Sequence, residues 1–148
     1  MPGTTVRIIL GIIMMLGMIV TASACGEESA TDSGDEVREY ADPAAEEILS
    51  ALSDGDYEKY TQRFDRTMTA AVTEDVFNQT VDLIKAKIGD YVSKEFWKVE
   101  EQGLNTIAYY KAEFTEEPAG VEVRVVFQKS KEEMKVSGLW FDSPKLRQ

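Results

Sequence analysis

The stretch EDVFNQTVDLIKAKIGDYVSKEFWKVEEQ (residues 74–102) contains the change in hydrophobic period that decides the fold class. Up to Ile88, apolar side chains recur every three or four positions, as they do along one face of a helix. Gly89 follows, and glycine commonly ends a helix in the left-handed conformation. After Gly89 the apolar period becomes two, which indicates β-strands. The sequence therefore predicts helices first and strands afterwards.

Further helices are predicted before residue 74. Asp42 is expected to be the N-cap of the first, with Pro43 at its first helical position, and Asp54-Gly55 is expected to end it. Asp56 and Asp65 each precede apolar residues at helical spacing, so each is expected to cap a short helix.

The strands are expected over residues 95–102, 106–115, 121–128 and 134–141, with turns at Gly103, Pro118-Ala119-Gly120 and Ser130–Glu133. Alternating runs joined by polar turns are typical of an antiparallel meander. Because the helices precede the strands, the expected fold class is α+β. The N-terminal helices would pack on a curved four-stranded antiparallel sheet in a cone-like domain over residues 43–144, followed by a tail at 145–148.

Alternation along the strands predicts two sheet faces. The face toward the helices should carry Tyr110, Ala112, Phe114, Val123, Val125 and Phe127. The opposite face is not fully polar, because five apolar or aromatic residues interrupt its charges: Ile107, Tyr109, Val126, Leu139 and Phe141. If strand pairing gathers these five, their patch would be a docking site for a second copy of the chain or for a partner protein.

From Asp42 to Pro144 the chain resembles a small domain family of unknown function in the nuclear-transport-factor-2-like (cystatin-like) α+β cone superfamily. The resemblance rests on a Leu-rich first helix, Gly55-Asp56-Tyr57, Phe64-Asp65 with Met68, the helix ending at Gly89, and the terminal run 136–141 (VSGLWF). It implies a cone with a pocket between sheet and helices. It also implies a secreted or lipid-anchored protein, sometimes fused to a hydrolase, and supplies no catalytic residues.

The N-terminus has the pattern of an export signal over residues 1–24. Ile8–Val20 is an unbroken apolar run of 13 residues, whereas spanning a bilayer takes about 20. The segment Ala22-Ser23-Ala24-Cys25 resembles the lipobox of prokaryotic lipoproteins, which implies that Cys25 is lipid-modified. The alternatives are an uncleaved anchor helix and simple cleavage that leaves a free Cys25.

Residues 25–42 are expected to form the lipidated cysteine and a flexible acidic tether, since this segment has few apolar residues to bury. An acidic binding tail is the alternative. The expected location is therefore the cell envelope, on the extracytoplasmic face of the membrane, with the acyl group as the membrane contact.

Composition excludes several function classes. The chain has 16 basic and 27 acidic residues and a net charge of −11, so we expect no nucleic-acid binding. It has no histidine, which excludes Ser-His, Cys-His and His-metal sites, and its single cysteine excludes an intrachain disulfide. No metal site and no cofactor are predicted.

Aromatic residues provide the candidate pocket for a small apolar ligand. Tyrosine and tryptophan combine an apolar body with a polar group, as ligand pockets require. The expected lining is Tyr57, Tyr60, Phe64, Trp97, Tyr110 and Trp140. As core and rim residues of a small sheet, the same side chains would need no ligand.

Asp65 and Tyr60 are the weak catalytic candidates, as a base and a proton donor. Helix capping explains Asp65 equally well. Three functions remain open: a lipid-anchored binding or accessory module, which we favour; an isomerase or dehydratase working in the cone pocket; and a structural or dimerising surface domain.

Overall fold

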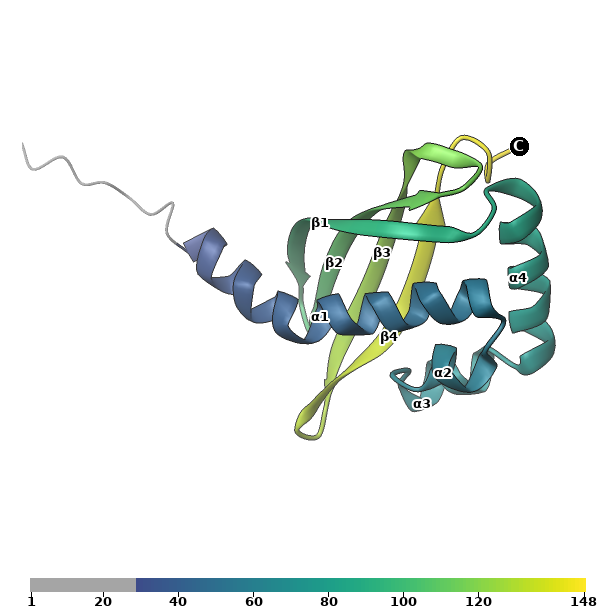
Figure 1. Ribbon diagram of the computed structural model, residues 1–148. Helices are drawn as coiled ribbons and strands as arrows, with labels where there is room; N and C mark the ends of the chain where they lie inside the picture. Colours follow the sequence, from purple (N-terminus) through teal and green to yellow (C-terminus); the bar gives the residue numbers. More distant parts are fainter. Residues whose placement is uncertain (1–28) are drawn as a thin grey trace, which may run out of the picture.

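The computed structural model describes residues 29–148, in which four helices precede four strands (Figure 1). The helices are α1 (Ser29–Asp54), α2 (Tyr57–Thr61), α3 (Arg66–Ala71) and α4 (Glu74–Lys87). The expected signal peptide and Cys25 lie outside the described residues. Within the described part of the chain, no helix is both long and apolar enough to cross a membrane.

The strands form one antiparallel sheet in the order β1-β2-β3-β4, so each strand pairs with its neighbour in sequence. Their bounds are β1 (Tyr91–Gln102), β2 (Asn105–Phe114), β3 (Glu117–Ser130) and β4 (Glu133–Asp142). The helices cover one face of this curved sheet (Figure 1). The α+β class and the meander are therefore confirmed.

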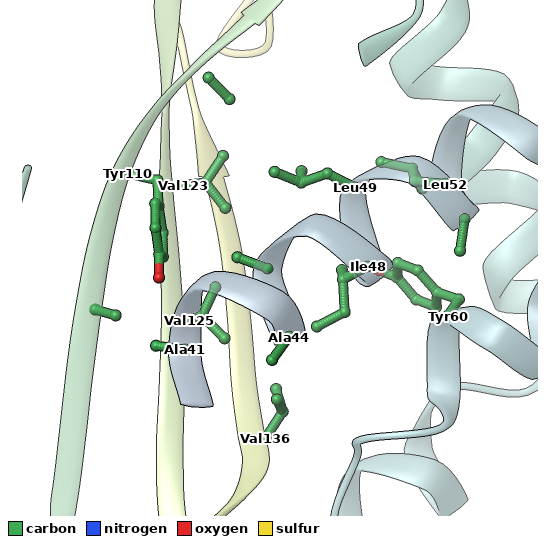
Figure 2. Close-up of a cluster of buried hydrophobic side chains, with 14 of the residues drawn as sticks. Ala41, Ala44, Ile48, Leu49, Leu52, Tyr60, Tyr110, Val123, Val125 and Val136 are labelled. Atoms are coloured by element: carbon green, nitrogen blue, oxygen red, sulfur yellow. The ribbon is translucent and has the colours of Figure 1, made fainter. Parts of the chain in front are cut away.

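The core lies between α1 and the face of the sheet that the helices cover, which we call the inner face (Figure 2). All six side chains predicted for this face are buried, with at most 1% of their surface exposed. Ile48, Leu49 and Leu52 of α1 pack opposite them. Each large apolar side chain buried in this way contributes roughly 1.5–3 kcal/mol to stability.

Helix α1 begins well before the predicted boundary at Asp42. Its apolar stripe continues backward through Ala41 and Val37, which are both buried, so residues 29–42 are helical rather than a flexible tether. Pro43 lies inside the helix, where a proline costs about 3 kcal/mol. We attribute its tolerance to the packing of the residues on both sides of it.

Asp42 is consequently not an N-cap. Its Oδ1 accepts a hydrogen bond of 2.9 Å from the Tyr110 hydroxyl, and its Oδ2 lies 3.1 Å from the Arg38 guanidinium. The hydrogen bond ties the middle of α1 to β2 across 68 positions of sequence. The other predicted caps are confirmed: Asp56 accepts from the Lys59 amide and Asp65 accepts from the Met68 amide.

The second hairpin turns earlier than predicted. Phe114 pairs with Glu117, so the turn is Thr115-Glu116, and Pro118-Ala119-Gly120 lies inside β3. The three residues fall in an irregular stretch of the β2–β3 pairing, before the pairing with β4 begins at Glu122. Proline is tolerated there because its missing N–H faces no partner strand.

A bulge in β4 decides which of its residues face the helices. Val126 pairs with Gly138 and Phe127 with Val136, which leaves Ser137 as the extra residue. Beyond the bulge, Leu139 pairs with Val125 and Phe141 with Val123, and both pack against the core. The prediction that Leu139 and Phe141 belong to the opposite face is therefore wrong.

Gly89 links the last helix to the sheet, and its predicted left-handed conformation is confirmed by φ of +84°. The chain returns close to it, since the Glu116 amide donates to the Ile88 carbonyl at 2.9 Å. A Cβ on Gly89 would lie 2.0 Å from Thr115 Oγ1, so the position requires glycine for steric as well as conformational reasons.

We expect Gly89→Ala to reduce the free energy of unfolding by about 2–4 kcal/mol, the sum of the left-handed penalty and the clash with Thr115. Gly55→Ala is the matched control, because Gly55 has φ of +72° but open space around its Cα. It should cost about 1–2 kcal/mol. Urea unfolding of both variants measures the difference, and equal losses would contradict the steric account.

Candidate binding surface on the outer face of the sheet

The predicted interior pocket is filled by its own lining. Tyr57 and Tyr60 pack on Phe77 of α4, with ring centroids 5.7 and 4.8 Å away, and Phe64 packs edge-on against Tyr60 at 5.2 Å. Tyr110 is fully buried in the core, elsewhere on the same inner face. These four residues are packing residues of the cone interior.

Trp97 and Trp140 lie on the opposite face of the sheet, which we call the outer face. Trp97 is the extra residue of an irregularity between Phe96 and Lys98 in β1, and Trp140 pairs with the outer-face residue Arg124. They are 48% and 56% exposed. The six residues predicted as one pocket are therefore divided between two faces.

The weak catalytic pair is also not supported by the geometry. Asp65 Oδ1 accepts the Met68 amide at 2.7 Å, which is the capping role. Tyr60 is 4% exposed, and burial raises its pKa above the ordinary value near 10, so it is a poor proton donor at neutral pH. Within residues 29–148, no group of three or more acidic or cysteine side chains could hold a metal ion.

A row of alternating cations and aromatic rings crosses the outer face. In strand register, Lys98 of β1 lies opposite Tyr109 of β2, Tyr109 opposite Arg124 of β3, and Arg124 opposite Trp140 of β4. The Lys98 ammonium lies 4.3 Å from the Tyr109 ring centroid, and the Arg124 guanidinium lies 5.7 Å from it. Cation–π contacts of this kind contribute about 0.5–1 kcal/mol at exposed sites.

Carboxylates complete this network. The Tyr109 hydroxyl donates to Glu100 at 2.8 Å, and Glu100 also pairs with Lys98. The hydrogen bond from Lys98 holds the pKa of Glu100 below its usual range, and the hydrogen bond to Glu100 raises the pKa of Tyr109. Arg124 pairs with Glu122 at 2.6 Å. The charged groups of the row are thus matched within the face.

A shallow groove of about 300 Å³ lies beside the row. It is lined by the apolar and aromatic residues Ile107, Tyr109, Val126 and Trp140 and by the polar residues Arg124, Gln102 and Asn105. Tyr109 and Val126 are only 8% and 9% exposed, so Trp140 is the most exposed of its aromatic and apolar residues. The Trp140 indole lies over Gly138, because a Cβ on that glycine would come within 2.5 Å of the ring. Three of the five residues predicted for the docking patch, Ile107, Tyr109 and Val126, are therefore on this surface.

The outer face belongs to the less acidic half of the domain. Residues 29–88, which form the helices, have six Lys and Arg against 14 Asp and Glu. Residues 89–148, which form the sheet, have nine Lys and Arg against 11 Asp and Glu. An approaching macromolecule or ligand therefore meets strong negative charge on the helical side and near neutrality on the sheet.

Sequence reasoning missed that Trp97 and Trp140 belong to this surface. Strict alternation is the usual guide to sheet faces, and an extra residue in β1 and another in β4 each shift it by one position. Strands β2 and β3 alternate regularly around Tyr109 and Val126, and for these two residues alternation predicted the outer face correctly.

Comparison with known proteins gives one family and a set of fold neighbours. A family model described as "Protein of unknown function (DUF3887)" matches residues 45–139. No curated protein matches the chain. The solved structures that resemble it include a protein named Rd1NTF2_05 with five substitutions, which has 13% identity and a TM-score of 0.50; the match covers 73% of this chain and 100% of that one.

Two natural proteins are more distant. A SEC-C motif containing protein from Rhodopseudomonas palustris has 13% identity and a TM-score of 0.46, covering 70% of this chain and 90% of its own. An NTF2-like protein of unknown function from Cytophaga hutchinsonii has 15% identity and a TM-score of 0.34. The match covers 67% of this chain and 87% of that protein. At these identities the likeness concerns the fold alone.

Three tyrosines make the stability of this domain fall at high pH. Tyr60 and Tyr110 are buried and Tyr91 is partly buried, and desolvation is the main cause that raises their pKa values above the ordinary value near 10. The folded state therefore keeps these phenols protonated where the unfolded chain ionises them. Their contribution to stability is fully present below about pH 10 and is lost as the pH rises further.

We expect the free energy of unfolding in urea to fall steadily above about pH 10, and Tyr60→Phe to remove part of that slope. Absorbance at 295 nm should show the native tyrosines ionising at higher pH than the same chain in urea. Superimposed native and unfolded titration curves would contradict the burial of these hydroxyls.

Proposed function

The chain belongs to the family described as Protein of unknown function (DUF3887), with an NTF2-like α+β cone fold, and from this premise we propose that it is a lipid-anchored extracytoplasmic binding or accessory module. Its binding surface is the outer face of the sheet, and not the interior of the cone.

One observation carries this choice of surface. Both tryptophans of the chain are about half exposed on the outer face. Large exposed aromatic groups next to a groove, with polar groups at its rim, are typical of binding surfaces. The inner face meanwhile is occupied by α1 and the aromatic cluster around Phe77.

Two further arguments favour a binding module over the enzyme. Asp65 caps α3 and Tyr60 is buried, so the interior offers no accessible acid–base pair from the predicted set. On the outer face, the pKa of Glu100 is lowered rather than raised, chiefly by its hydrogen bond with Lys98. A general acid at neutral pH needs the opposite shift. A dimerising role would use the same outer face.

The location rests on the sequence pattern at Cys25. Removal of residues 1–24 would also remove Arg7 and leave the mature chain more acidic than its present net charge of −11. Anionic headgroups repel such a surface, so an acyl chain would supply the membrane affinity without a basic patch.

Cys25→Ser should release the protein from membranes into the soluble fraction without unfolding it, because the described core begins at Val37. Fractionation and circular dichroism of the released chain check the two parts of this expectation. Intact mass spectrometry of the wild-type chain should show the added acyl mass. Unchanged membrane association of the variant would overturn the lipid anchor.

Hydroxyl-radical footprinting in isolated envelopes tests the binding surface before its ligand is known. We expect Trp97 or Trp140 to be oxidised several-fold more slowly in envelopes than in the purified full chain, because a bound partner excludes solvent. Leu104, 90% exposed in the turn between β1 and β2, is the internal reference. If both tryptophans react at the same rate relative to Leu104 in both samples, the outer face is unoccupied and the proposed function fails.

A further inference from the structure

We propose that the groove beside Trp140 binds an uncharged saccharide, with one sugar ring stacked on the indole and its hydroxyls hydrogen-bonded at the rim. The inference rests on the proposed function and names the ligand class for the same surface. It depends on three properties of the groove: an open aromatic ring, matched charges, and amides at its edge.

Trp140 and Trp97 have similar exposure but different surroundings. The Trp97 ring has the ammonium groups of Lys98 and Lys111 at 5.1 and 4.9 Å from its centroid, and the Tyr109 ring edge-on at 6.3 Å. Two cations and an aromatic ring therefore already lie against this indole, and a stacking ligand would have to compete with them.

The Trp140 ring is more open than that of Trp97. A Cβ on Gly138 would come within 2.5 and 2.6 Å of two carbons of its six-membered ring, so the indole lies close to the backbone there, and the residue is 56% exposed. Within residues 29–148, no lysine or arginine lies over this ring. An exposed indole with no cation against it is available for stacking by a ligand ring.

The charges around the groove select an uncharged ligand. Arg124, which lines the groove, is paired with Glu122, and the neighbouring Lys98 is paired with Glu100. A phosphate or carboxylate ligand bound to either cation would have to displace its carboxylate and leave that carboxylate without its partner. An uncharged ligand disturbs neither pair.

The polar groups that remain at the rim suit hydroxyls. Gln102 and Asn105 line the groove, and the Gln128 amide donates to Asn105 Oδ1 at 2.6 Å, which orients the Asn105 amide. Amides both donate and accept, as a hydroxyl requires. A sugar ring has an apolar C–H face and a hydroxyl edge, so it matches the indole and the amides at the same time.

The dimensions agree with a short saccharide. A volume of about 300 Å³ is at the lower end of the range for small-molecule sites. Trp140 is on β4, which is an edge strand of the sheet, so the groove is not closed at that side. A longer uncharged chain could therefore continue past the domain.

The test is a titration of the purified full chain, in a detergent without a sugar headgroup, with chitotetraose and cellotetraose as uncharged probes. Binding is followed by tryptophan fluorescence and by isothermal calorimetry. We expect saturable binding of at least one probe. Trp140→Ala should weaken it about tenfold or more, as expected for the loss of an aromatic contact of about 1.4 kcal/mol.

Trp97→Ala is the matched control, because it removes an indole of similar exposure whose ring already contacts Lys98 and Lys111. Binding should change by less than about twofold. Circular dichroism of both variants confirms that the fold is retained. A sulfated tetrasaccharide should not bind.

The outcomes are distinguishable from those of the proposed function. Absence of binding for both uncharged probes, or equal losses in the two tryptophan variants, would overturn the saccharide inference. If the footprint of Trp140 in envelopes persists in that case, the outer face still binds a partner of another kind. Self-association of the wild-type chain that is lost in Trp140→Ala would identify a second copy as the occupant and would likewise overturn the inference.

Discussion

The packing of α1 against the inner face of the sheet determines what the remaining surfaces can do. Ala41, Ala44, Ile48, Leu49 and Leu52 of the helix are almost fully buried and belong to one hydrophobic cluster with the side chains of the inner face (Figure 2). Protein interiors packed in this way have the density of organic crystals. The hydrogen bond from Tyr110 to Asp42 fixes the helix along its axis. The cone interior is occupied by these side chains, and the proposed binding surface is therefore on the other side of the sheet.

The outer face has its composition because of two irregularities in the strands. The extra residue in β1 places Trp97 outward, and the bulge at Ser137 places Trp140 outward while returning Leu139 and Phe141 to the core. Between the two indoles, Tyr109 and Arg124 form a row with their own counter-charges. The same backbone features therefore complete the core and form the candidate site.

Much of the fold could be predicted from the sequence, because the change of period at Gly89 and the caps at Asp56 and Asp65 are local signals. The start of α1 could not be predicted, since Asp42-Pro43 is a strong local start signal and only tertiary contacts of Val37 and Ala41 override it. For the site, the alternation of apolar and polar residues correctly predicted that Ile107, Tyr109 and Val126 lie on the outer face. The same rule assigned residues of β1 and β4 to the wrong face, because one extra residue in a strand exchanges its two faces.

The measurement that tests the central claim most directly uses the fact that the chain has two tryptophans. In a chain labelled with 5-fluorotryptophan, fluorine resonances of Trp97 and Trp140 report the outer face, and backbone amides of Ala108, Val123 and Val125 report the interior. On titration with the uncharged glycan fraction of its own envelope, the account requires the Trp140 resonance to move while the interior amides stay fixed. Movement of the interior amides with both tryptophan resonances unchanged would contradict it.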